Sequence, residues 1–83
     1  MSPEAKWGGA MDGAALRAWL ARHGLSQSGG ARLLGVRVTT MQRWCQDQRE
    51  IPPPAVRLCW ACDRDPSLVA ALRERAEAAA EAA

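Results

Sequence analysis

Arginine is the side chain whose number and placement in this sequence point most directly to chemistry. Ten of the eleven basic residues are arginine, and eight of these lie between residues 17 and 64 against three acidic residues, a balance of +5. Residues 65–83 carry two arginines and four acidic residues, a balance of −2. The planar guanidinium fork matches phosphate oxygens and the edge of guanine. This segregation of charge favours a nucleic-acid partner, although GC-rich coding would produce a similar arginine bias.

The cysteines and the single histidine allow a second kind of chemistry. Cys59 and Cys62 form a CxxC pair, and Cys45 and His23 could complete a tetrahedral zinc site. The same CxxC pattern on an apolar helix also arises when free cysteines simply pack as small apolar side chains. We expect this packing role, with His23 as a partner of a helix C-terminal dipole. A small zinc- or redox-sensing regulator is the alternative.

The sequence lacks the residue patterns of a catalytic site. It contains no nucleophile–base pair, glycine-rich phosphate loop or carboxylate pair, so we expect neither an enzyme nor a bound cofactor or metal. Its 83 residues suffice for one small domain. Phe and Tyr are absent, so most of the bulky packing is expected from the tryptophans at positions 7, 19, 44 and 60. No apolar run approaches the ~20 residues of a membrane span, and no signal-peptide core is present. We therefore expect a soluble, cytoplasmic domain without a disulfide framework.

Glycine and proline divide the sequence into short segments with helical periodicity and no strand pattern. Residues 1–11 are expected to form a flexible arm, and residues 12–72 the folded domain. Capping and stop signals predict helices that run from Asp12 to Gly24, from Ser26 to Gly35, from Val38 to about Gln46, from the prolines at 52–54 to about Cys62, and from Asp65 through Leu72. Residues 73–83 form an alanine- and glutamate-rich helical tail that should fray for want of packing. The predicted fold is a compact all-α bundle of five helices.

Residues 24–52, GLSQSGGARLLGVRVTTMQRWCQDQREIP, carry the most informative pattern. Two short segments meet at a glycine turn, and Leu34, Val36, Met41 and Trp44 form one joint apolar face. This pattern resembles the helix-turn-helix of the Cro/lambda-repressor (XRE) family, and the resemblance extends from about Met11 to Leu58. It implies a lambda-repressor-like fold that binds double-stranded DNA. Small proteins of this build resemble phage regulators, anti-CRISPR-associated repressors and antitoxins.

The resemblance also implies roles for individual residues. The segment that begins at Val38 becomes the recognition helix, and its base-contacting positions are Val38, Thr39, Thr40 and Arg43. The phosphate-contacting positions are Gln27, Arg37, Gln42 and Arg49. Plainer roles remain open: the threonines could cap or pack the start of a helix, Arg43 could be solvated, and Arg49 could pair with Glu50 or Asp47. Four further arginines are expected on solvated helix faces: Arg17, Arg22, Arg32 and Arg57.

Three positions depart from the family pattern. Gly29 and Gly30 replace an acidic and a large apolar residue, which should weaken the second helix and leave core volume unfilled. Arg37 stands where Ser or Thr would normally cap the recognition helix. Asp47 occupies the usual glycine after that helix, a position that Asp tolerates in the left-handed region better than most residues.

A single helix-turn-helix makes too few base contacts for tight specific binding, so both the resemblance and the geometry point to a homodimer. We expect its interface within residues 55–72, from Val56, Cys59, Trp60, Leu68, Val69 and Leu72. These helices could instead only close the monomer core. The simplest mechanism is a repressor that occupies an inverted-repeat operator in its own promoter region. The alternative function is an antitoxin-like module that binds and neutralises a partner protein. Lys6 and Trp7 of the arm could reach the minor groove, although disorder is the simpler expectation.

Overall fold

The computed structural model describes residues 10–82 of the chain, and the side chains among them up to residue 79. Within this range the chain forms five α-helices and no strand, which confirms the all-α prediction. The helices are α1 (Gly13–Arg22), α2 (Gln27–Leu34), α3 (Val38–Cys45), α4 (Pro53–Arg64) and α5 (Ser67–Ala82). The expected arm at residues 1–9, with Lys6 and Trp7, lies outside the described residues.

Local capping determines where the first two helices begin and end. The Asp12 carboxylate accepts the Ala15 N–H at 2.8 Å, and the Ser26 hydroxyl accepts the Gly29 N–H at 2.9 Å. Each bond satisfies one of the backbone donors that the first turn of a helix leaves without a partner. Gly24 and Gly35 end α1 and α2 with positive φ values of 64° and 77°, as the sequence predicts.

The last helix includes the predicted alanine- and glutamate-rich tail. Asp65 accepts hydrogen bonds from both the backbone N–H and the hydroxyl of Ser67, and α5 then continues without a break to Ala82. Residues 33, 34, 72 and 76 line a shared groove between α2 and α5, and Ala76 is half-buried. The tail thus packs on α2, which the sequence pattern did not indicate.

The core lies between α1, α2, α3 and α4. Its fully buried side chains include Leu16, Trp19, Met41, Val56 and Cys59. Met11 is also buried, so the core begins one residue before the predicted cap at Asp12 and the arm does not extend to residue 11. The expectation that tryptophans supply the bulky packing holds for Trp19 and Trp44, but Trp60 is 45% exposed.

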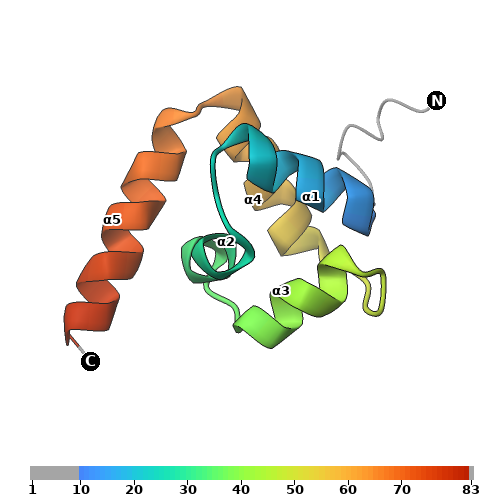
Figure 1. The fold of residues 1–83 in the computed structure, drawn as a ribbon. Helices are drawn as coiled ribbons and strands as arrows, with labels where there is room; N and C mark the ends of the chain where they lie inside the picture. Colours follow the sequence, from blue (N-terminus) through green and yellow to red (C-terminus); the bar gives the residue numbers. More distant parts are fainter. Residues whose placement is uncertain (1–9, 83) are drawn as a thin grey trace.

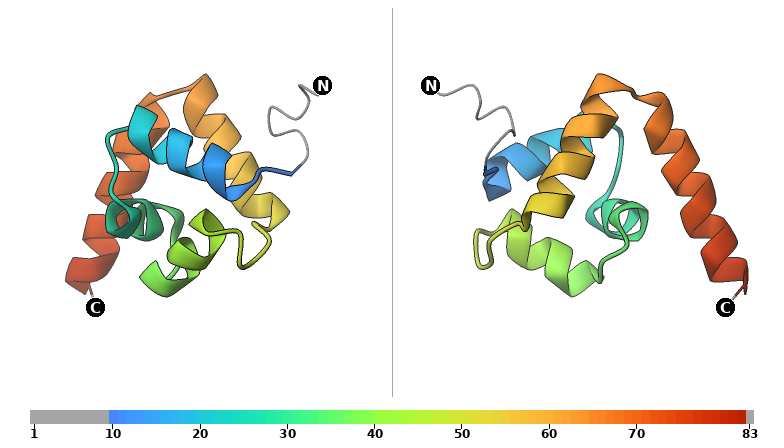
Figure 2. Two further views of the ribbon diagram at one scale, coloured as in Figure 1. Left: turned by 45° about the vertical axis from the view of Figure 1, so that its right-hand side comes forward. Right: turned by 180° about the vertical axis from the view of Figure 1, so that it is seen from behind.

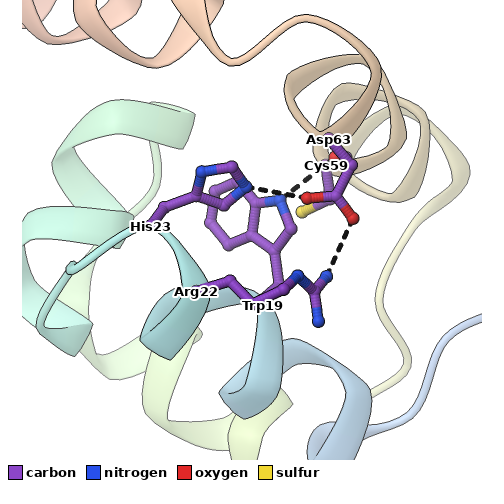
Figure 3. Close-up of polar contacts among 5 residues, drawn as sticks. All are labelled: Trp19, Arg22, His23, Cys59 and Asp63. Carbon is purple, nitrogen blue, oxygen red and sulfur yellow. Dashed lines mark hydrogen bonds and ion pairs between the residues drawn. The ribbon is translucent and has the colours of Figure 1, made fainter.

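Polar contacts tie the end of α1 to the end of α4 (Figure 3). The Trp19 indole N–H donates to the Cys59 carbonyl at 3.0 Å. The Asp63 carboxylate contacts the Arg22 guanidinium at 2.8 Å and the His23 ring at 2.7 Å. His23 directly follows α1, at the position expected of a partner for the C-terminal dipole of that helix. It also contacts the Asp63 carboxylate on α4.

The helices are arranged around α2 (Figures 1 and 2). The helix α5 packs on one side of α2 and α3 on another, while α4 and α5 diverge as an open V. The C-terminal end of α5 lies at the same height as α3 in all three views.

Gly30 is a point of close approach rather than a site of missing core volume. A Cβ atom at this position would collide with Leu20 Cδ2 and would lie 3.4 Å from Met41 Cε. Leu20 therefore occupies the space that a larger side chain at position 30 would fill, and the expectation of unfilled volume is wrong. At Gly29 the nearest side-chain atoms to such a Cβ are Ser26 Oγ at 3.3 Å and Leu25 Cδ2 at 3.8 Å.

The two glycines should respond differently to the same substitution. We expect Gly30→Ala to lower the free energy of unfolding by about 1–2 kcal/mol, because overpacking against Leu20 outweighs the gain in helix propensity. In Gly29→Ala the gain in helix propensity offsets the tight contact, so the change should stay within about 1 kcal/mol. Urea denaturation of both variants measures the difference, and equal effects would show that Leu20 moves aside without cost.

Candidate nucleic-acid interface

The helix α3 presents one buried and one exposed face. Met41, Trp44 and Cys45 are buried against the other helices, as predicted for Met41 and Trp44. Because residues advance by ~100° per position in an α-helix, the other side chains must face outward. Val38 is 39% exposed, Thr40 is half-buried, and the remaining polar positions of this face are exposed, namely Thr39, Gln42 and Arg43. The structure therefore brings the four predicted base-contacting residues onto one helix and leaves them accessible.

Three exposed arginines lie on α3 or next to it in the chain. Arg37 precedes α3, Arg43 lies within it, and Arg49 follows in the loop to α4. None of the three forms an ion pair or hydrogen bond with another described residue. The suggested pairing of Arg49 with Glu50 or Asp47 is absent from the described contacts. These guanidinium groups remain open to an external acceptor.

The start of α3 has no side-chain cap. Arg37 occupies the cap position without bonding the helix, and no threonine hydroxyl bonds the backbone there. The alternative role of Thr39 and Thr40 as caps therefore has no support among the described contacts. Gln27, the remaining predicted phosphate contact, is half-buried at the first residue of α2.

Most of the predicted dimer-interface residues belong to the core of the chain itself. Val56, Cys59 and Val69 are 2%, 0% and 9% exposed, so they have no surface left for a second copy. The prediction is wrong for these three residues because α4 turns Val56 and Cys59, and α5 turns Val69, into the core of the chain itself. Leu68 and Leu72 are half-buried against the same core. Trp60 remains available, with the Arg64 guanidinium 5.6 Å from the centre of its ring.

The cysteines are buried thiols. Burial raises the pKa of Cys59 from 9.0 to about 12, with the neighbouring Cys62 and Asp63 adding to the effect. Burial also raises the pKa of Cys45 and of Cys62. Because zinc binds the thiolate, a raised pKa opposes metal binding. Among residues 10–79, no group of three or more His, Cys, Asp and Glu side chains is arranged to hold a metal ion.

Two contacts between α1 and the end of α3 were not anticipated from the sequence. The Asp47 carboxylate accepts the Gly13 N–H at 2.8 Å, and the Arg17 guanidinium donates to the Cys45 carbonyl. Arg17 was expected on a solvated face, yet it bonds α3. The one available signal was Asp47, whose predicted left-handed conformation is confirmed by a φ of 59°.

Comparisons of the chain with protein-family models, curated proteins and solved structures found no match in any of the three. None of the helices in the described part of the chain has the length and apolar character needed to cross a membrane. Inferences about the role of the α3 surface therefore come from its own geometry and charge.

The buried thiols should make stability depend on pH in the alkaline range. The folded protein keeps the Cys59 proton at pH values at which the unfolded chain loses it, because the folded pKa is about 12 and the ordinary value is 9.0. This contribution is fully present below pH 9 and is lost as the pH rises toward 12. Urea denaturation across this range should show a falling free energy of unfolding. Cys59→Ala, although less stable at neutral pH, should show a shallower decline; an unchanged slope would contradict the assignment.

Proposed function

We propose that the chain is a sequence-specific DNA-binding regulator, that α2 and α3 form its helix-turn-helix, and that α3 enters the major groove. The observation that carries this proposal is the exposed face of α3, which presents Val38, Thr39 and Arg43 while Met41 and Trp44 anchor the opposite face in the core. An α-helix fits the width of the major groove, where each base pair presents a distinct pattern of donors, acceptors and methyl groups.

The chemistry of this face suits base reading. The Arg43 guanidinium can donate two hydrogen bonds to O6 and N7 of guanine, and the methyl groups of valine and threonine suit the thymine methyl. Thr40, half-buried, reads from the edge of the face. This combination discriminates between base pairs, which a uniformly basic surface would not.

The flanking side chains suit phosphate. Arg37 and Arg49 bracket α3 in the chain and have no acceptor among the described residues, while Gln42 and Gln27 add neutral donors. Phosphate contacts fix the register of a protein on the duplex without reading sequence. The proposal therefore divides the surface into a central base-reading group and an outer positioning group.

A dimer completes the proposed function. Two copies related by a two-fold axis would place their α3 helices in successive major grooves, about 34 Å apart. We assign the self-association surface to Trp60, an exposed aromatic side chain of the kind that dominates binding energy at interfaces. Such a dimer acts as a repressor by occupying a promoter, and as a phage-type regulator it works in the cytoplasm with the DNA.

Selection of bound fragments from a random pool of duplexes at fixed salt tests the function directly. We expect an inverted repeat whose half-sites are centred one helical turn apart. Arg43→Ala should reduce affinity for the selected site by ~1–3 kcal/mol and relax the preference at one base pair. Arg49→Ala should weaken all sequences alike and reduce the salt slope by about one.

The matched control is Arg57→Ala, which removes an exposed arginine from α4 without touching the α3 surface. This variant should retain the wild-type base preferences. Enrichment of no sequence from the pool would refute the proposed function, and an unchanged base preference in Arg43→Ala would remove Arg43 from the base-reading group.

Replacement of the exposed tryptophan tests the dimer separately. We expect Trp60→Ala to shift the chain toward monomer in sedimentation equilibrium, because a buried aromatic anchor typically contributes ~2 kcal/mol or more to an interface. Val38→Ala truncates the other large apolar side chain that is exposed among the described residues, and it should leave the association unchanged. If both variants self-associate like the wild type, the interface lies elsewhere.

A further inference from the structure

The helices α1 and α3 exchange polar groups at their adjoining ends. The first residue of α1, Gly13, donates its N–H to Asp47, which lies two residues after α3. In return Arg17 of α1 donates to the Cys45 carbonyl, the last residue of α3. A carboxylate thus meets the positive end of one helix dipole and a guanidinium meets the negative end of the other.

The two backbones are in direct contact at this junction. A Cβ atom on Gly13 would lie 2.8 Å from the Cys45 carbonyl carbon and 2.9 Å from the Trp44 carbonyl oxygen, distances that no real side chain tolerates. Asp47 reaches Gly13 from a left-handed conformation, φ 59°, which reverses the chain directly after α3. The position of the end of α3 relative to α1 is therefore fixed by backbone contact as well as by hydrogen bonds.

The opposite end of α3 is held differently, by packing against α2 and without a side-chain cap. Arg37 provides no side-chain cap, and the chain reaches α3 from α2 through residues 35–37. Val38 and Cys45 are seven residues apart, which is about 10 Å along a helix axis. Because the junction holds the C-terminal end of α3 against α1, loss of it would let this end shift while the contact with α2 remains. Such a tilt would displace the exposed side chains of α3.

We propose that Asp47 and Arg17 are positioning residues for base reading, which set the sequence specificity of α3 through the α1 junction. This inference rests on the proposed function of α3. Asp47 lies outside α3, and the described hydrogen bond of its carboxylate goes to Gly13. Arg17 is held by the Cys45 carbonyl, unlike Arg43. Both residues act on DNA through the orientation of α3.

The test compares two glycine variants of aspartates that bond the same end of α1. Asp47→Gly removes the carboxylate bonded to Gly13, and glycine adopts the left-handed conformation without strain. Asp12→Gly removes the carboxylate bonded to Ala15, also at 2.8 Å, but leaves the α1–α3 junction intact. Both substitutions remove one negative charge, so the change in net charge is the same in the two variants.

The measured quantity is the ratio of affinity for the selected site to affinity for random duplex, corrected for the active fraction by stoichiometric titration. We expect Asp47→Gly to reduce this ratio about tenfold, the discrimination that one good base contact carries. Asp12→Gly should keep the wild-type ratio even if it lowers stability. Asp47→Asn, which retains an oxygen acceptor and tolerates the left-handed region, should restore the ratio. Arg17→Ala should behave like Asp47→Gly.

Equal ratios for Asp47→Gly and Asp12→Gly would overturn the positioning role while leaving the proposed function in place. Failure of Asp47→Asn to restore the ratio would likewise overturn it, since the acceptor would then not be the cause. If the wild-type protein binds the selected and random duplexes alike, the proposed function itself fails and this inference with it.

Discussion

Burial of one side of α3 is the constraint on which the rest of the structure depends. Met41 and Trp44 occupy the core with α1, α2 and α4 around them, and the helical period then decides which side chains remain outside. Small residues make this packing possible. Gly30 admits Leu20, and Gly13 admits the carbonyl groups that end α3, so both close approaches depend on the lack of a Cβ atom.

Helix positions could be predicted because their signals are local. Asp12, Ser26 and the glycines at 24 and 35 act within a few residues of the backbone groups that they satisfy or release, and the structure places the boundaries accordingly. The joint burial of Met41 and Trp44 followed from their spacing of three. The accessibility of Arg43 followed in turn, since it lies on the opposite side of the same helix.

What could not be predicted depends on contacts between distant residues. The hydrogen bond between Gly13 and Asp47 joins residues 34 positions apart, and no residue pattern near Gly13 predicts it. The spacing of apolar residues likewise does not predict whether an apolar helix face packs into the core of its own chain or against a second copy. Val56 and Cys59, which were expected at an interface, are therefore buried in the core of the chain, whereas Trp60 is exposed. The contact of the α5 tail with α2 could not be predicted for the same reason, because the surface that it packs on comes from another segment.

The placement of α5 gives the molecule an uneven electric field. Its last two turns contain Glu77 and Glu81 and no basic residue, and this end of the helix lies at the height of α3 (Figures 1 and 2). Eight of the ten arginines lie among residues 17–64, and the other two, Arg73 and Arg75, precede these last turns, so positive charge is concentrated away from the end of α5. Near a polyanion this uneven charge produces a torque before any contact forms, and the rotation favours approach by the arginine-bearing helices over approach by the last turns of α5. Diffusional encounters would then begin from a restricted set of orientations, and added salt would broaden that set by screening the field.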